Sequence, residues 1–146
     1  MYCNDIENCS KKFKFYLFAD DTNSLYSEKT LRSLERIVNE ELCHLYDWLS
    51  SNKLSLNFKK SNYVIFHPYQ KKLAHQPVIK MFNSELNANE ELICNDYIKY
   101  LGVLMDKNLS WKYHVEHVLN KISKTIGMIS KLRHFVPKHT LLNIYK

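Results

Sequence analysis

The segment Lys14-Phe15-Tyr16-Leu17-Phe18-Ala19-Asp20-Asp21-Thr22-Asn23 decides the fold of this chain. Side chains ahead of the two aspartates alternate with a period of two, which is typical of a β-strand. Residues 13–26 therefore predict a strand, a tight turn and a return strand that Leu25 and Tyr26 close. Neighbouring side chains of a regular strand point to opposite faces, so two consecutive carboxylates share one side only where the backbone turns sharply.

Two adjacent carboxylates at a turn also suggest chemistry. They repel each other at a few ångströms, and a divalent cation relieves that repulsion. Mg²⁺ commonly binds one or two protein carboxylates together with water and phosphate oxygens. Two such ions about 4 Å apart can stabilise the attacking and the leaving oxygen of a displacement at phosphorus. Asp20 and Asp21 are thus candidate ligands of a two-metal nucleotidyl-transfer site, with an ordinary surface turn as the alternative.

A long helix is predicted directly after the hairpin. Apolar residues at steps of three, four and one form a single stripe from Leu31 to Leu49, which is the pattern of an amphipathic helix. Ser27 is the expected N-cap and Glu28 suits the first turn, so the helix is predicted over residues 28–51.

Short strands are predicted in the middle of the chain. They cover residues 62–66, 78–82, 91–94 and 97–105, separated by polar or turn-forming residues,. With the hairpin and the helices, these strands predict an α+β fold in which one mixed sheet is covered on one side.

A second long helix is predicted near the C-terminus. Its apolar stripe runs from Trp111 to Leu132, with Ser110 as the expected N-cap and Pro137 as the residue that breaks it,. Leu141, Leu142 and Tyr145, after Pro137, begin a further predicted helix.

Charge is distributed unevenly along the chain. Residues 1–106 hold 13 Lys and Arg against 14 Asp and Glu, a balance of −1. Residues 107–146 hold eight against Glu116 alone, a balance of +7. So basic a segment attracts a polyanion, most plausibly nucleic acid, with a solvated helix face as the alternative.

Composition narrows the class of protein. The 146 residues are 45% hydrophobic and 25% charged, which suits a globular domain with a core. No apolar run approaches the roughly 20 residues that span a bilayer, and the first residues lack a secretory signal pattern. Cys3, Cys9, Cys43 and Cys94 show no CxxC spacing and are interpreted as reduced thiols rather than two disulfides,. We expect an intracellular protein, with nucleus and cytoplasm both open.

Several segments of the sequence resemble those of a known family. Residues 14–23 resemble the Phe-Ala-Asp-Asp catalytic box of reverse transcriptases from non-LTR retrotransposons, especially the jockey-like group, where phenylalanine in the first position is usual. Upstream, residues 1–6 resemble the Tyr-Ile-Asn-Asp-Leu segment that leads into this box, with Cys3 in place of the aliphatic residue.

Further segments carry the resemblance in the same order. Trp48-Leu49 and residues 52–66 resemble the next palm motif, in which Lys60 falls on the motif's lysine and Ser61 replaces its usual threonine. Lys99 to Asp106, with Leu109-Ser110-Trp111, resembles the segment that positions the primer end, and Lys121 to Pro137 resembles the helix leading into the thumb. The resemblance implies a partial polymerase palm over residues 1–106, with a catalytic β-hairpin, a helix and a mixed antiparallel sheet. Residues 107–146 would be a basic helical segment leading into a truncated thumb.

The resemblance also implies roles for individual residues. Asp20 and Asp21 would be catalytic ligands of two Mg²⁺ or Mn²⁺ ions. Lys60 would lie near the leaving pyrophosphate, unless it is an ordinary basic loop residue. Tyr100, Leu101 and Gly102 would form part of the primer-end platform, unless they belong to a plain core strand.

The resemblance implies an RNA template, a DNA primer and deoxynucleoside triphosphates as partners. It implies no membrane partner, and it leaves the oligomeric state open. The basic residues that would contact nucleic acid are Lys121, Lys124, Lys131 and Arg133.

Part of the implied catalytic machinery is missing from the sequence. Palms of this family need a further aspartate on an earlier strand, and neither Asp5 nor Asp106 falls in that motif. We therefore expect a fragment or degenerate copy that cannot polymerise DNA alone, and magnesium-dependent primer extension by the 146 residues would contradict this. Two alternatives remain open, a non-catalytic nucleic-acid-binding remnant that uses the basic C-terminal helix, and a remnant without activity. An uncovered sheet edge and apolar face should cause poor solubility or self-association.

Four other side chains are given structural interpretations. Trp48 and Trp111 are expected in the core rather than as platforms for base stacking. His114 and His117 lie one helical turn apart, but no cysteine or carboxylate completes a zinc set with them,.

Overall fold

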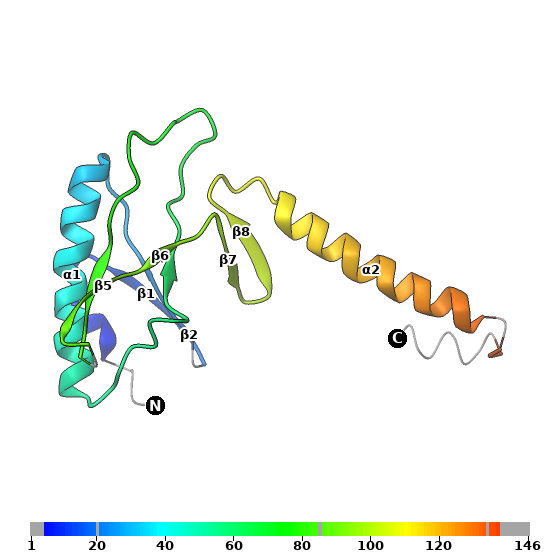
Figure 1. The fold of residues 1–146 in the computed structure, drawn as a ribbon, viewed down its shortest axis with the longest axis horizontal. Helices are drawn as coiled ribbons and strands as arrows, with labels where there is room; N and C mark the ends of the chain where they lie inside the picture. Colours follow the sequence, from blue (N-terminus) through cyan, green and yellow to red (C-terminus); the bar gives the residue numbers. More distant parts are fainter. Residues whose placement is uncertain (1–4, 20, 85, 134, 138–146) are drawn as a thin grey trace. The chain divides into compact units, whose positions relative to one another are not determined.

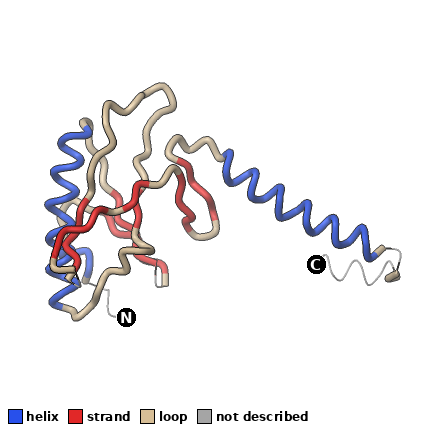
Figure 2. The backbone as a smooth tube through the Cα atoms, viewed as in Figure 1, coloured by secondary structure: helices blue, strands red, loops and turns tan. Residues whose placement is uncertain are grey.

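The computed structural model describes residues 5–19, 21–84, 86–133 and 135–137. The chain divides into two compact units, which are described separately. The first consists of Met1–Tyr63 and Gln70–Cys94, and the second of Val64–Tyr69 and Asn95–Lys146. The described residues form two α-helices, a short 3-10 helix and eight strands (Figures 1 and 2), so the predicted α+β class is confirmed at that level. No described helix is long and apolar enough to cross a membrane.

The first unit begins with the 3-10 helix η1 (Ile6–Cys9) and the hairpin of β1 (Lys14–Phe18) and β2 (Asp21–Leu25). The two strands pair antiparallel without a bulge, so that the first residue of β1 lies opposite the last residue of β2. The hairpin predicted from the period-two pattern is therefore confirmed.

Helix α1 (Leu31–Ser51) confirms the helix predicted over residues 28–51, but it begins three residues later. Thr30 is its N-cap, because its backbone is still extended and its Oγ1 accepts a hydrogen bond from the Ser33 N–H at 3.2 Å. The predicted N-cap, Ser27, is wrong because it lies nearly one turn too early along the chain.

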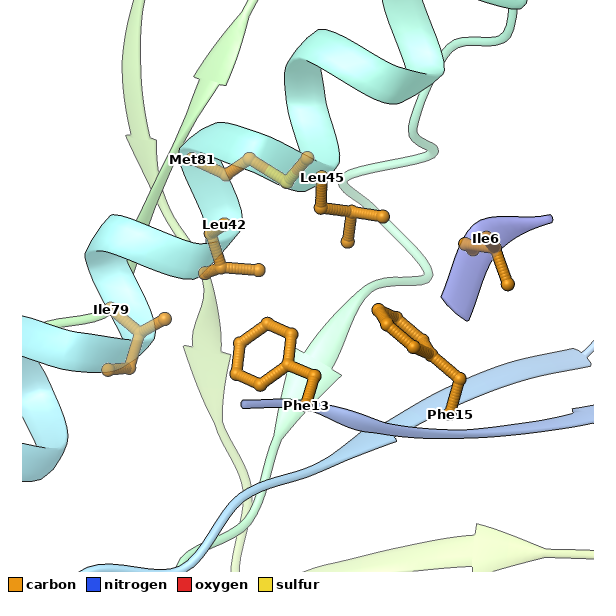
Figure 3. Packing of buried hydrophobic residues seen from close by; sticks show 7 residues of the cluster. All are labelled: Ile6, Phe13, Phe15, Leu42, Leu45, Ile79 and Met81. Carbon is orange, nitrogen blue, oxygen red and sulfur yellow. The ribbon is translucent and has the colours of Figure 1, made fainter. Parts of the chain in front are cut away.

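The core of this unit lies between α1, the hairpin and strand β4 (Figure 3). Its buried apolar side chains are Ile6, Phe13, Phe15, Leu42, Leu45, Ile79 and Met81. Phe13 and Phe15 meet edge to face with ring centroids 6.0 Å apart. Because Phe15 lies in this core, one face of the hairpin packs against the same buried side chains as α1.

The other strands of the first unit are short. β4 (Lys80–Asn83) pairs antiparallel with β5 (Ala88–Glu91), and β3 (Asn62–Tyr63) pairs parallel with β6 (Ile93–Cys94). The side chain of Asn39, on α1, forms two hydrogen bonds with the backbone at the start of β4, in the way a neighbouring strand would. Its Nδ2 donates to the Val78 carbonyl at 3.0 Å, and its Oδ1 accepts from the Lys80 N–H at 2.8 Å.

Two predictions about the strands are wrong. The strand expected over residues 62–66 is only two residues long, because the chain leaves the first unit after Tyr63. The single mixed sheet is also wrong for the described residues, whose strands form four separate two-stranded sheets. Most of these pairs join strands that are neighbours in the sequence, so local turns rather than one shared sheet organise them.

A buried polar cluster joins the start of the chain to α1. The carboxylate of Glu41, which is 5% exposed, accepts a hydrogen bond from the Ser10 hydroxyl and pairs with Lys12 Nζ at 3.2 Å. The Ser10 Oγ in turn accepts from the Phe13 N–H at 2.9 Å. The Ser10 hydrogen bond lowers the pKa of Glu41, against the opposing effect of burial and with help from Lys12.

Replacing Glu41 by alanine should lower the free energy of unfolding by about 2–3 kcal/mol, because the buried Ser10 hydroxyl and Lys12 lose their acceptor. Urea denaturation followed by circular dichroism measures this effect. Glu40→Ala is the matched control, since Glu40 is exposed and its ion pair with Arg36 (2.8 Å) is worth roughly 0.5 kcal/mol,. Equal losses in the two variants would contradict the structural role of Glu41.

The second unit contains β7 (Tyr97–Tyr100), β8 (Val103–Asp106) and α2 (Lys112–Leu132). The single strand predicted over residues 97–105 is wrong, because the chain reverses at Leu101 and Gly102. Both turn residues have positive φ, 46° and 86°, which matches the twist of a two-residue hairpin loop and suits glycine at the second position,.

Candidate functional site

Asp21, one of the two predicted metal ligands, lies at the tip of the hairpin of β1 and β2. Ala19 has a left-handed backbone with φ of 53°, which permits the sharp reversal between the strands,. Asp20 lies outside the described residues. Asp21 is the first residue of β2, opposite Phe18, and its side chain is exposed.

The surroundings of Asp21 are open and apolar. Along its face of the hairpin, Tyr16, Phe18 and Leu25 are each about half exposed. Asp21 forms no side-chain hydrogen bond or ion pair with the described residues, so its carboxylate oxygens are available to a ligand. Since Mg²⁺ takes few protein carboxylates and completes its shell with water and phosphate, an exposed aspartate at a tight turn fits this ion.

No larger metal-binding group is found in the described part of the chain. It contains no cluster of three or more His, Cys, Asp or Glu side chains placed to hold an ion. Cys9, Cys43 and Cys94 are free thiols. Any metal at the hairpin tip would therefore depend on the two aspartates and on ligands from outside the described residues.

Lys60 lies in the turn before β3, in the same unit as the hairpin. Its side chain is exposed, and its backbone N–H donates to the Asn57 carbonyl at 3.0 Å. No hydrogen bond or ion pair joins Lys60 to Asp21 among the described residues. Its exposure leaves the Lys60 ammonium able to meet a phosphate.

Tyr100, Leu101 and Gly102 form the end of β7 and the turn into β8. Leu101 is 48% exposed, and no atom lies within 4 Å of the position that a Cβ on Gly102 would occupy. The predicted platform is thus the tip of a second hairpin, open on the glycine side, and a ligand backbone can approach it closely.

The basic residues of the second unit lie along α2. Lys121, Lys124 and Lys131 are exposed and form no ion pairs with described residues, and Arg133 is the C-cap. Glu116 is the one acidic residue within the bounds of α2. The helix therefore offers several ammonium groups to solvent without nearby compensation.

The two tryptophans differ from each other. Trp48 packs against the core of the first unit, as predicted, and its Nε1–H has no hydrogen-bond partner among the described residues. The core position predicted for Trp111 is wrong, since it is 48% exposed with a left-handed φ of 63° and is the N-cap of α2.

The two histidines of α2 also differ in their surroundings. The Nδ1 of His114 accepts from the Leu104 N–H at 3.4 Å, and His117 is exposed.

Asp106 is a structural residue that the sequence patterns did not single out. It is 4% exposed and accepts hydrogen bonds from three backbone N–H groups. The donors are Asn108 at 3.3 Å, Ser110 at 3.1 Å and Trp111 at 3.0 Å. Ser110 is not the N-cap that was predicted, because α2 begins at Lys112 and Trp111, with its left-handed backbone, is the N-cap. Burial alone would raise the pKa of Asp106, but the hydrogen bonds from Ser110, Trp111 and Asn108 outweigh it, and the pKa is lowered.

A pocket in the first unit does not suit a nucleotide. Its volume is about 80 Å³, and its lining includes Tyr46, Leu49, Leu56 and Phe82. Pockets for small ligands usually measure roughly 300–1,000 Å³.

Comparisons with protein-family models, with curated proteins and with solved structures find no match for this chain. The class that the fold itself defines is a mixed α+β protein with two helices and several small sheets.

Proposed function

We propose that this chain is a palm-to-thumb segment of an RNA-directed DNA polymerase, the reverse transcriptase of a jockey-like non-LTR retrotransposon. The observation that carries the proposal is the hairpin of β1 and β2, whose two-residue turn lies beside an exposed Asp21 within the Phe-Ala-Asp-Asp box. A polymerase metal site needs a carboxylate that is presented by ordered backbone and is free to bind an ion, and Asp21, paired in β2 and without a side-chain partner among the described residues, supports this role.

Each residue would have its own part in the complete enzyme. Two Mg²⁺ or Mn²⁺ ions would supply activation of the primer hydroxyl and stabilisation of the leaving pyrophosphate. Asp20 and Asp21 would hold them through carboxylate oxygens. Lys60 would neutralise charge on the pyrophosphate or donate a proton to it. Tyr100, Leu101 and Gly102 would support the primer end, where glycine lets the nucleic-acid backbone come close.

A hybrid polymerase tests this proposal. The 146 residues replace the corresponding segment of an active jockey-like reverse transcriptase, which supplies the fingers and the earlier palm strands. We expect magnesium-dependent extension of a DNA primer on an RNA template with deoxynucleoside triphosphates. A hybrid that folds and binds the primer–template but makes no DNA would contradict the proposal.

A second candidate function is nucleic-acid binding without catalysis, which the exposed lysines of α2 favour. Replacing four basic residues by glutamine should lower the affinity for DNA and RNA at least about tenfold and reduce the salt slope by up to roughly 3.6 on duplex DNA, because each phosphate contact releases close to one counterion. The four residues are Lys121, Lys124, Lys131 and Arg133.

Fluorescence anisotropy over a salt series measures this binding. A matched control removes the same charge from exposed lysines of the first unit, namely Lys11, Lys29, Lys71 and Lys72. Asp20→Asn should leave binding intact or improve it. Equal losses in the two quadruple variants would assign the effect to net charge rather than to α2, and no binding by the unmodified chain at low salt would favour a remnant without activity.

A further inference from the structure

Helix α2 carries an apolar surface that the described residues of its unit leave largely uncovered. Its first turn meets the hairpin of β7 and β8, where Tyr113 stacks on Tyr97 with ring centroids 4.9 Å apart. No residue of α2 is buried. An amphipathic helix gains most of its stability from burying its apolar face, so we expect a binding partner to cover this surface.

The uncovered surface is a continuous stripe of seven aliphatic side chains, called the α2 stripe below. Six of the seven are between 37% and 58% exposed. The members of the α2 stripe are Val115, Val118, Leu119, Ile122, Ile126, Ile129 and Leu132.

The spacing of the α2 stripe is that of a coiled coil. Val115, Ile122 and Ile129 recur every seven residues, and Val118, Thr125 and Leu132 recur between them after three. Alternating steps of three and four, here over the 18 residues from Val115 to Leu132, keep one seam on one side of a helix,. Leu119 and Ile126 widen the seam on one flank.

We propose that the α2 stripe is a self-association surface, on which α2 of a second copy of this chain packs antiparallel. This proposal is independent of the polymerase assignment, because it rests on the helix alone.

The length of the seam suits a dimer. A half-exposed aliphatic side chain brings roughly 60–90 Å² of apolar surface. Seven from each copy would together remove about 1,000 Å² from water, which reaches the lower limit of a specific interface. Lys124 and Lys131 lie roughly 150–170° around the helix from the middle of the stripe, so their ammonium groups stay in solvent when the stripe is covered.

The charge distribution favours the antiparallel arrangement. Lys121, Lys124 and Lys131 lie in the middle and at the end of α2, and Glu116, its one acidic residue, lies near its start. Antiparallel pairing places Lys131 of the two copies at opposite ends of the dimer, sets Glu116 of each copy level with Lys131 of the other, and opposes the helix dipoles. Val115 of one copy then faces Leu132 of the other, and Ile122 faces Thr125, so the seam has a polar residue only near its centre.

Sedimentation equilibrium of the full chain tests the proposal, at concentrations from about 1 to 200 µM, which bracket a micromolar dissociation constant. We expect a monomer–dimer equilibrium that Ile122→Glu weakens at least about 100-fold, because two carboxylates would be buried in the seam. Asn120→Glu, which adds the same charge on the exposed opposite face, should associate like the unmodified chain. Thr125→Ile should tighten the dimer about tenfold, which also tests the seam with a variant that favours folding.

Other results would overturn the proposal. A monomer throughout the concentration range would do so, as would association that survives Ile122→Glu and therefore uses another surface, such as the apolar face of the hairpin of β1 and β2. A chain that is monomeric in buffer but sediments with phosphatidylserine vesicles through the α2 stripe would assign this surface to anionic lipid instead. Primer extension by the hybrid polymerase is a separate measurement, so the failure of one proposal is distinguishable from the failure of the other.

Discussion

Replacing Asp21 by asparagine in the hybrid polymerase should slow primer extension by about 10³-fold, because a metal-held transition state is stabilised by several kcal/mol and each ~1.4 kcal/mol is tenfold in rate. Asparagine has nearly the same size as aspartate but lacks the charge that holds a divalent ion. The substitution should leave the hairpin intact, since the Asp21 side chain is exposed and makes no hydrogen bond to the described residues. Single-turnover extension of a labelled primer, at saturating nucleotide, measures the chemical step.

A matched substitution separates metal binding from a general loss of charge. Asp47 is an exposed aspartate on α1, and Asp47→Asn makes the same chemical change away from the hairpin. It should leave the rate within about twofold of the unmodified hybrid, as surface substitutions usually cost little. If Asp21→Asn stayed within fivefold of the unmodified hybrid as well, the aspartate pair would be an ordinary surface turn.

The hairpin and both long helices could be predicted because their signals are local. A period of two over residues 13–18 and an apolar stripe from Leu31 to Leu49 both require side chains that are close in sequence to share a face. The structure has a strand and a helix at these places. The same reasoning predicted α2, whose stripe is present although none of its residues is buried among the described residues.

Strand pairing could not be predicted in the same way, because it depends on residues that are distant in the sequence. β3 pairs with β6, some thirty residues further along, and only over two residues. The turn at Leu101 and Gly102 was also missed, since a left-handed leucine has no sequence signal and Gly102 alone also suits a strand beside a ligand,.

The helix starts show a different limit. Ser27 and Ser110 are good capping residues, but Thr30 and Trp111 hold those positions. The position of an N-cap depends on where the preceding segment turns into the helix. Before α2, the carboxylate of Asp106, which accepts from the Trp111 N–H, fixes this position, although Asp106 is not next to the helix in the sequence. Local patterns identify the aspartate pair as candidate ligands but do not predict the complete metal site. Asp20 lies outside the described residues, and the remaining ligands are expected from other segments.

Replacing Asp106 by alanine should lower the free energy of unfolding of the second unit by about 3 kcal/mol, because three backbone N–H groups lose an ionised acceptor in a buried position. Urea denaturation followed by fluorescence measures this in a Trp48→Phe background, where Trp111 is the one remaining tryptophan and lies in the second unit. Asp96→Ala is the control from the same unit. Asp96 is exposed, and its ion pair with Lys107 (2.7 Å) should contribute roughly 0.5 kcal/mol,.

The contribution of Asp106 should also depend on pH in a defined direction. Its pKa in the folded protein is lowered from the ordinary value of 3.8, so folding favours the ionised form. The stabilisation is therefore complete above that ordinary value and is lost as the pH falls through the lower pKa of the folded protein. The difference in unfolding free energy between the unmodified chain and Asp106→Ala should be constant from pH 5 to 7 and shrink below about pH 3.8. A difference that stayed constant to pH 2 would mean that Asp106 stabilises the start of α2 by packing rather than as a carboxylate acceptor.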